Sequence, residues 1–131
     1  MDFSNFNTVD GSEEGRFLHL RHPSTNALLY EGEGDNRIKV GIWLRGIESK
    51  TVLEAINADK RRATKGEDAD EEFATVSALV IRFQGLHRGK KELTTGNDAL
   101  RRFFDQSSLL VQAVLDFTSK PANFLPAASK D

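Results

Sequence analysis

The fold of this 131-residue chain is decided by the stretch Ile38-Lys39-Val40-Gly41-Ile42-Trp43-Leu44. Its aliphatic side chains alternate strictly with Lys39, Gly41 and Trp43, and a period of two is typical of a strand with one buried face. Trp43 falls on the face opposite the aliphatic residues, where it would cover the sheet or lie in a contact surface. The stretch therefore predicts a half-buried β-strand.

The residues before this strand predict a hairpin. Two short apolar segments, 16–21 and 27–30, flank the turn Pro23-Ser24-Thr25-Asn26. Pro presets φ in such a turn, and Asn tolerates a left-handed position. Residues 1–15 are rich in Asn, Ser, Asp, Glu and Gly, and they predict a flexible N-terminal arm.

After Gly46 the spacing of apolar residues becomes helical. Ser49 is a suitable N-cap for a helix that should fray in the charged segment 60–70. A second helix is predicted by apolar residues at spacings of three and four, and it is the most hydrophobic of the chain. The residues on its stripe are Phe73, Val76, Leu79, Val80 and Phe83, followed by Leu86.

The last third of the chain predicts one or two further helices. Apolar residues recur from Leu100 to Phe104 and again from Leu110 to Phe117, with a possible break at 105–108, and Pro121 blocks continuation. The sequence thus predicts an α+β fold, with a small N-terminal antiparallel sheet (the hairpin plus a third strand) followed by three or four packed helices. One domain should span 16–125, with a polar C-terminal tail at 126–131.

The composition argues against several functional classes. Lys and Arg number 18 against 20 Asp and Glu, so the basic excess typical of a wide nucleic-acid footprint is missing. The absence of cysteine excludes disulfides, thiolate nucleophiles and Cys-based zinc sites. The polar start of the chain lacks the basic region of a signal peptide, and the longest apolar run, 78–81, is too short to span a membrane.

No pattern of residues predicts catalysis. The three histidines, His19, His22 and His87, have neither a carboxylate partner at a recognisable spacing nor the spacing of a metal site. They are better interpreted as surface or turn residues. We therefore expect no enzyme activity, no metal, no cofactor and no small-molecule substrate.

Two kinds of residue could bind a macromolecule. The basic clusters at 60–62 and 88–91 could contact nucleic acid, but a solvated helix end explains the first one better. Apolar residues beyond a Pro near the chain end either dock on the domain or present a partner surface. The candidate partner-binding residues are Trp43, Phe117, Phe124 and Leu125.

Three segments, in this order, resemble a known family. The first is the strand and turn 17–28, and the second runs from 80–86 through a polar turn to 93–100. The third is 110–117, closing on Ala122-Asn123-Phe124-Leu125. This arrangement is similar to the tail assembly chaperones of long-tailed, non-contractile (siphophage-type) bacteriophages.

The chain also departs from the pattern of that family at two places. Asn26 stands where the family usually has Gly, a change that Asn tolerates because it accepts left-handed φ. Ser107-Ser108 replaces a Pro-aromatic pair, which leaves open whether the last two helices are separate.

The resemblance implies a chaperone that binds the tape-measure protein, keeps it soluble and helps recruit tail-tube subunits. It further implies a homo-oligomer in the host cytoplasm that is absent from the mature virion, with no bound nucleic acid and no membrane attachment. Two alternatives remain open. One is a structural morphogenesis protein such as a head–tail connector or tail-completion factor, and the other is a small nucleic-acid-binding regulator.

Overall fold

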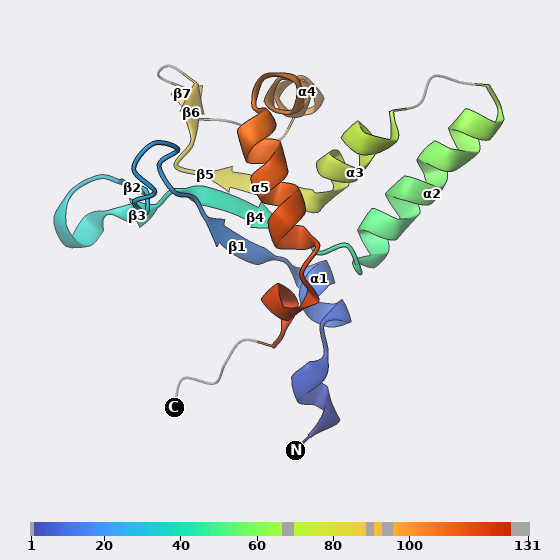
Figure 1. Ribbon diagram of the computed structural model, residues 1–131, viewed down its shortest axis with the longest axis horizontal. Coiled ribbons are helices and arrows are strands. Elements are labelled where there is room, and N and C mark those ends of the chain that lie inside the picture. The colour runs from blue at the N-terminus through green and yellow to red at the C-terminus, as the bar shows by residue number, and fades with distance from the viewer. Residues whose placement is uncertain (1, 67–69, 89–90, 93–95, 127–131) are drawn as a thin grey trace.

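The computed structural model describes residues 2–66, 70–88, 91–92 and 96–126. Within these ranges the protein is α+β, with a three-stranded antiparallel sheet, two two-stranded ribbons and five α-helices (Figure 1). The predicted fold class is therefore confirmed. Residues 127–131, most of the predicted polar tail, lie outside the described residues.

The central sheet has the order β1-β4-β5, formed by Arg16–His19, Gly41–Leu44 and Val80–Gln84. Ile42 and Leu44 are fully buried, whereas Trp43 between them is half-buried. The predicted alternation is thus confirmed for the second half of the stretch. Its first half, Ile38–Lys39, forms a separate strand, β3, that pairs with β2 (Tyr30–Glu31).

The predicted hairpin is only partly correct. Asn26 adopts the expected left-handed conformation, with φ of 61°, and Arg21 forms an isolated bridge with Leu28. However, the ladder partner of β1 is β4, not the returning segment. Leu29 lies between the two pairings, because its N–H donates to the carbonyl of Leu20 while its own carbonyl accepts from the N–H of Val40. The chain therefore leaves the first strand after one bridge and pairs with β3.

The first long helix begins and ends as the sequence predicts. In α2 (Lys50–Thr64), Ser49 is the N-cap and its hydroxyl accepts from the N–H of Val52. The helix ends one residue before Lys65, and Gly66 follows with φ of 75°. After residues 67–69, which are outside the description, Asp70 caps α3 (Glu71–Leu79) by accepting from the N–H of Phe73.

The second predicted helix is wrong beyond Leu79. Residues 80–84 form β5 and pair with β4, although Val80 and Phe83 are buried in the core as expected. Two buried residues that lie three apart fit a helix, but they also fit a strand whose pairing contains an irregularity. Such an irregularity is present here, because the β4–β5 register shifts between Trp43 and Leu44. The sheet is therefore not confined to the N-terminal part of the chain.

The last two helices are separate. Ser107 ends α4 (Asn97–Gln106) and precedes α5 (Ser108–Thr118), as the possible break at 105–108 suggested. Pro121 then opens a 3₁₀ turn, η3 (Pro121–Phe124). A short ribbon of β6 (His87–Arg88) and β7 (Lys91–Glu92) precedes α4. None of the helices in the described ranges has the length and apolar character that a membrane span requires.

The N-terminal segment is more ordered than its composition indicates. Residues 3–6 form a 3₁₀ helix, η1, and Val9–Glu14 form α1, two helical elements that the sequence did not predict in this segment. Gly11 is buried against the last turn, where a Cβ would overlap the carbonyl oxygen of Phe124. The absence of a side chain at Gly11 lets the two ends of the described chain pack together (Figure 1).

Glu13 ties α1 to the start of α2. Its carboxylate accepts hydrogen bonds from the hydroxyl of Ser49, at 2.6 Å, and from the hydroxyl and the backbone N–H of Thr51. These bonds, that from Ser49 foremost, hold the pKa of Glu13 below its ordinary value. The negative charge also lies at the N-terminus of α2, where the helix dipole favours it.

Replacing Glu13 by Gln should lower the free energy of unfolding at neutral pH. Because the folded-state pKa is lowered, the contribution of Glu13 is complete above the pKa of an unfolded glutamate, about 4.3, and is lost as the pH falls through the lowered value. Denaturant unfolding at several pH values should show the gap between wild type and variant closing in acid. Glu14→Gln is the control, because Glu14 is largely exposed. A gap that does not change with pH would contradict this role.

Candidate partner-binding surfaces

Trp43 is the centre of one face of the central sheet. Phe17, Trp43 and Arg82 are direct cross-strand partners, so their side chains share a face. His19 and Gln84, two residues along their strands, lie on the same side. We call these five residues the Trp43 face. The opposite face carries Ile42 and its neighbours and is covered by the helical core.

The rings on and beside the Trp43 face form a continuous row. The ring of Phe17 lies 5.2 Å from that of Trp43 and 6.1 Å from that of His19, and His19 in turn lies 4.9 Å from Tyr30. A guanidinium covers each end of the row, with Arg82 4.9 Å from the centroid of Trp43 and Arg37 3.9 Å from that of Tyr30. Aromatic and Arg side chains are the types most enriched at protein interfaces.

Trp43 also forms one wall of a cleft of about 530 Å³. The other walls include the N-terminal residues Ser4, Asn5 and Asn7, together with Arg16 and Pro126. This size lies within the range of about 300–1,000 Å³ found for binding pockets. The Trp43 side chain is held in place by a hydrogen bond from its Nε1 to Gln84 Oε1, at 3.2 Å. The Trp43 face and the Trp43 cleft thus form one continuous candidate site.

Leu125 lies beside this cleft. Its carbonyl accepts a hydrogen bond from Arg16 Nη2 at 3.0 Å, and its side chain is 38% exposed. The next residue, Pro126, lines the cleft with Trp43. Of the four residues that the sequence singled out, the structure therefore brings Trp43 and Leu125 to the same region.

Phe124 does not belong to an exposed surface. Its side chain is fully buried, and its ring meets the half-buried ring of Phe117 at 5.6 Å in an edge-on arrangement. The sequence left open whether this end of the chain docks on the domain or presents a partner surface. Phe124 docks, because the buried glycines Gly11 and Gly46 leave room for it. Its assignment as a contact residue stays a prediction, and in the structure its side chain lies inside the domain against the ring of Phe117.

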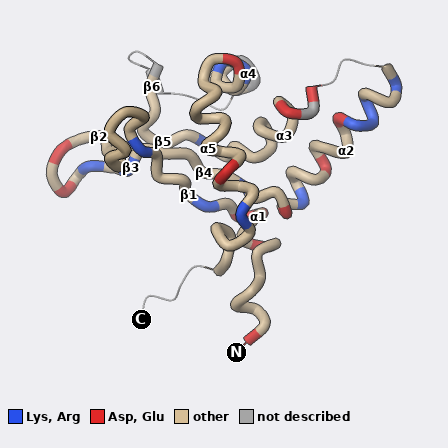
Figure 2. Tube along the Cα trace, in the orientation of Figure 1, with Lys and Arg blue, Asp and Glu red and all other residues tan. Residues whose placement is uncertain are grey.

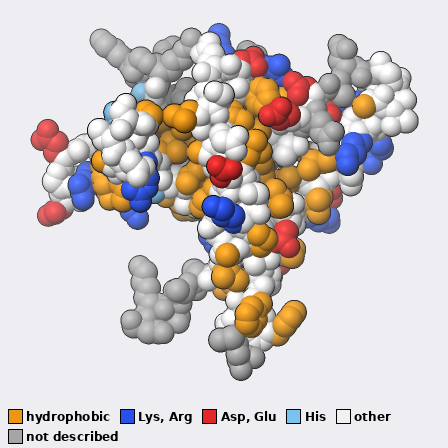
Figure 3. All heavy atoms as spheres, in the orientation of Figure 1, with side chains coloured by type: hydrophobic (Ala, Val, Ile, Leu, Met, Phe, Trp, Pro, Cys, Tyr) orange, Lys and Arg blue, Asp and Glu red, His pale blue; other side chains and the backbone are white. Residues whose placement is uncertain are grey.

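The sequence interpretation missed an apolar ridge at the N-terminus. Phe3, Phe6 and Val9 are 88%, 60% and 53% exposed, and we call them the N-terminal ridge (Figure 3). The first two residues lie three apart in a 3₁₀ helix, where side chains at this spacing fall on one side. The regular spacing of three, following an Asp at the N-cap, was the available signal, but the polar composition around it favoured an arm.

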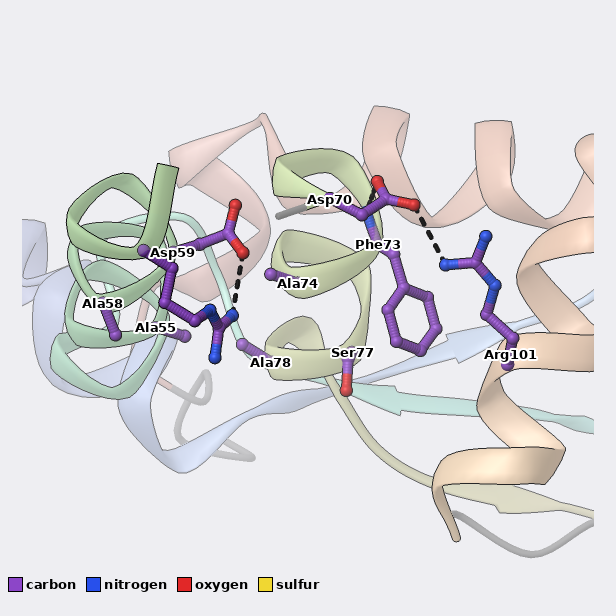
Figure 4. Close-up of a pocket in the computed structure, with 10 residues that line it drawn as sticks. Ala55, Ala58, Asp59, Asp70, Phe73, Ala74, Ser77, Ala78 and Arg101 are labelled. Atoms are coloured by element: carbon purple, nitrogen blue, oxygen red, sulfur yellow. Dashed lines mark hydrogen bonds and ion pairs between the residues drawn. The ribbon is translucent and has the colours of Figure 1, made fainter. Parts of the chain in front are cut away.

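A second hollow lies between α2 and α3. This α2–α3 groove has a volume of about 680 Å³ and is lined by small side chains from both helices, with an ion pair at each end (Figure 4). At one end Arg62 bonds the buried carboxylate of Asp59 at 2.8 Å, and at the other Arg101 of α4 bonds Asp70 at 2.9 Å. The small residues are Ala55, Ala58, Ala74, Ser77 and Ala78.

The histidines make ordinary structural contacts. His19 Nε2 lies 2.7 Å from the carbonyl of Leu29, His22 Nδ1 accepts from the N–H of Ser24, and His87 Nε2 lies 2.7 Å from Glu31. Among the residues that the structure describes, no group of three or more His, Asp or Glu side chains is placed to hold a metal ion.

Comparison of this chain with protein-family models, with curated proteins and with solved structures found no match.

Proposed function

We propose that this protein is a tail assembly chaperone of a siphophage-type bacteriophage. It binds the tape-measure protein, keeps that protein soluble and helps recruit tail-tube subunits. It acts in the host cytoplasm and does not remain in the mature virion. The observation that carries the proposal is the Trp43 face with its adjoining cleft, joined to the order of segments that resembles this family.

The chemistry of the site supports partner binding. An exposed or half-buried row of rings can bury large apolar areas on a partner, and its flanking Arg82 and Arg37 supply charge at the rim. A tape-measure protein needs such cover because its long apolar helices aggregate when they are exposed. Net charge of −2 and a charged fraction of 29% help to keep the chaperone itself in solution.

Co-expression with the tape-measure protein of the same genome tests the proposal. We expect the partner to be soluble only when this chain is present, and the two to elute together. If the partner is insoluble in both cases and this chain elutes alone, the proposal is wrong. Purified virions separate it from the connector alternative, since a connector stays in the particle and a chaperone does not.

Arg82→Glu should weaken co-elution at least several-fold. The Arg82 side chain is exposed, so the change reverses a charge on the Trp43 face and removes the cover of the Trp43 ring with little effect on the core. A pull-down with equal amounts of folded protein measures the effect. The matched control is Arg102→Glu on α4, an exposed residue away from the central sheet. Equal binding by both variants would show that the partner uses another surface.

Single-stranded nucleic acid is the second candidate ligand. The sequence placed this alternative on 60–62, but the aromatic row offers a better site because rings and Arg side chains on a sheet can stack bases. Its signature is retention on single-stranded DNA or RNA that weakens steeply as salt rises. Retention that the Arg82→Glu change abolishes would favour this function over the chaperone.

A further inference from the structure

The Trp43 cleft combines carboxylates with an aromatic wall. Asp10 and Glu14 of α1 both line it, and their spacing of four residues places them on the same side of the helix. Trp43 and Pro126 line it as well, and the Trp43 side chain is half-buried. A hollow with acidic groups on a helix and an indole ring on the sheet has the features that recognise a cation with an apolar stem.

The two carboxylates are not neutralised by the residues around them. Arg16 is the single Lys or Arg among the described residues that line the cleft. Its guanidinium donates to two backbone carbonyls, at 2.8 and 3.0 Å, and contacts Glu14 only at 3.4 Å. Asp10 forms no ion pair within the described part of the chain. The cleft therefore keeps an excess of negative charge.

The N-terminal segment beside the cleft is acidic throughout. Residues 2–14 contain four Asp or Glu and no Lys or Arg, so this end of the tube carries red but no blue (Figure 2). Arg82 lies over the Trp43 ring, 4.9 Å from its centroid, but it does not line the cleft. A concave site whose charges are mostly of one sign concentrates ligands of the opposite sign.

The walls of the cleft are fixed before a ligand binds. Asp2 accepts from the N–H of Ser4 at 2.9 Å and caps η1. Asn7 donates to the carboxylate of Asp10 at 2.7 Å and accepts from its backbone N–H at 3.1 Å, which connects η1 to α1. The hydrogen bond described above holds the Trp43 ring. A site that is already ordered loses little conformational entropy on binding.

From these charges and contacts, we propose that the Trp43 cleft binds a Lys or Arg side chain of the partner protein. The apolar stem of that side chain lies along Trp43 and Pro126, and its ammonium or guanidinium group pairs with Asp10 and Glu14. The inference rests on the proposed function for the existence of a partner, and it adds what the partner must present, an exposed basic side chain. The row of rings supplies apolar area, whereas the cleft fixes where the partner binds.

Fluorescence of Trp43 tests the cleft without any partner protein, because Trp43 is the one tryptophan of the chain. The ligands are two capped tripeptides, Ser-Lys-Ser and Ser-norleucine-Ser, since norleucine has the four-carbon stem of lysine without its ammonium group. At constant ionic strength the lysine tripeptide should give a saturable change in emission, and the norleucine tripeptide should bind far more weakly. Raising the salt concentration should weaken binding of the lysine tripeptide.

The cleft variant Asp10→Asn/Glu14→Gln should weaken binding of the lysine tripeptide by about tenfold. Both residues are exposed, and each new amide keeps an oxygen that can accept the hydrogen bonds of the original carboxylate, so circular dichroism should match wild type. The matched control is Asp35→Asn/Glu54→Gln, which removes the same two charges from exposed positions outside the cleft. It should bind the tripeptide as wild type does.

Three results would overturn the proposal. Equal binding of the two tripeptides would show that the cleft selects an apolar group and not a cation. Equal binding by the cleft variant and the control variant would place the lysine outside the cleft. Absence of binding of the lysine tripeptide to wild type, by both fluorescence and calorimetry, would show that no such site exists.

The same two variants then test the partner itself. Co-elution of the tape-measure protein should fall with the cleft variant and stay unchanged with the control. If the cleft variant binds that protein as wild type does, the cleft is not a contact for it. The solubility of the tape-measure protein in co-expression with wild type is scored separately and decides the proposed function, so the two failures are distinguishable.

Discussion

Replacing Phe124 by Ala should lower the free energy of unfolding by about 3–5 kcal/mol, the usual cost of removing a buried Phe ring. Phe124 is fully buried and packs edge-on against Phe117. The turn that carries it packs against α1, with its backbone close to Gly11. The loss should therefore also loosen α1, and urea unfolding monitored by circular dichroism measures the total effect.

Leu125→Ala is the matched control for this prediction. Leu125 is the adjacent residue but is 38% exposed, so its truncation should cost less than about 1 kcal/mol. Hydrogen exchange of the α1 amides gives an independent measure, because these amides should lose protection in the Phe124 variant alone. Equal unfolding free energies for the two variants would show that η3 is not docked as the structure describes.

The second large effect is expected at Ile42. Ile42→Ala should cost about 2–5 kcal/mol, because truncation of a buried aliphatic side chain leaves a cavity and Ile42 is fully buried in the middle strand of the sheet. Ile38→Ala is a control of the same residue type from the same alternating stretch. Ile38 is 47% exposed on β3, and its truncation should cost less than about 1 kcal/mol.

This pair of variants distinguishes the divided strand seen in the structure from the single continuous strand that strict alternation predicts. Strict alternation places Ile38 and Ile42 on one face of one strand, where both would be buried alike. In the structure the strand is divided near Val40, whose N–H donates to Leu29 instead of to a neighbour in the central sheet. Similar losses of unfolding free energy at both positions would favour a continuous strand and contradict the division.

The elements that could be predicted have local causes. The hydroxyl of Ser49 caps α2, Pro121 prevents extension of α5, and the alternation around Ile42 reflects burial on one side. Each of these signals acts through a few neighbouring residues, so a single sequence contains it. The α+β class follows from the sum of such signals.

The elements that were missed depend on residues far away in sequence. The segment 80–84 carries apolar residues at a spacing that suits a helix, and only pairing with β4 makes it a strand. Helix α1 is short and polar, and it is covered by η3 more than 100 residues later. Helices of this length gain most of their stability from tertiary packing, which a local pattern does not contain.

The candidate site could likewise be predicted only in part from local patterns in the sequence. Trp43 was singled out because alternation places it opposite the aliphatic residues, and it does lie at the centre of the aromatic row. Phe17 and His19 were not grouped with it, because that requires the register of β1 against β4. The burial of Phe124 could not be predicted, because a single sequence does not show that Gly11 and Gly46 leave room for it.

The packing of α1 against η3 has a consequence for synthesis on the ribosome. A contact that joins residues near 11 and 124 requires closure of a loop of more than 100 residues, and such long-range contacts form late. Until Phe124 has left the ribosome, η3 cannot pack against α1 or against the adjacent end of the sheet near Gly46. The apolar residues that η3 covers in the folded protein therefore stay exposed until Phe124 has emerged, and exposed apolar surface of this kind is prone to aggregation.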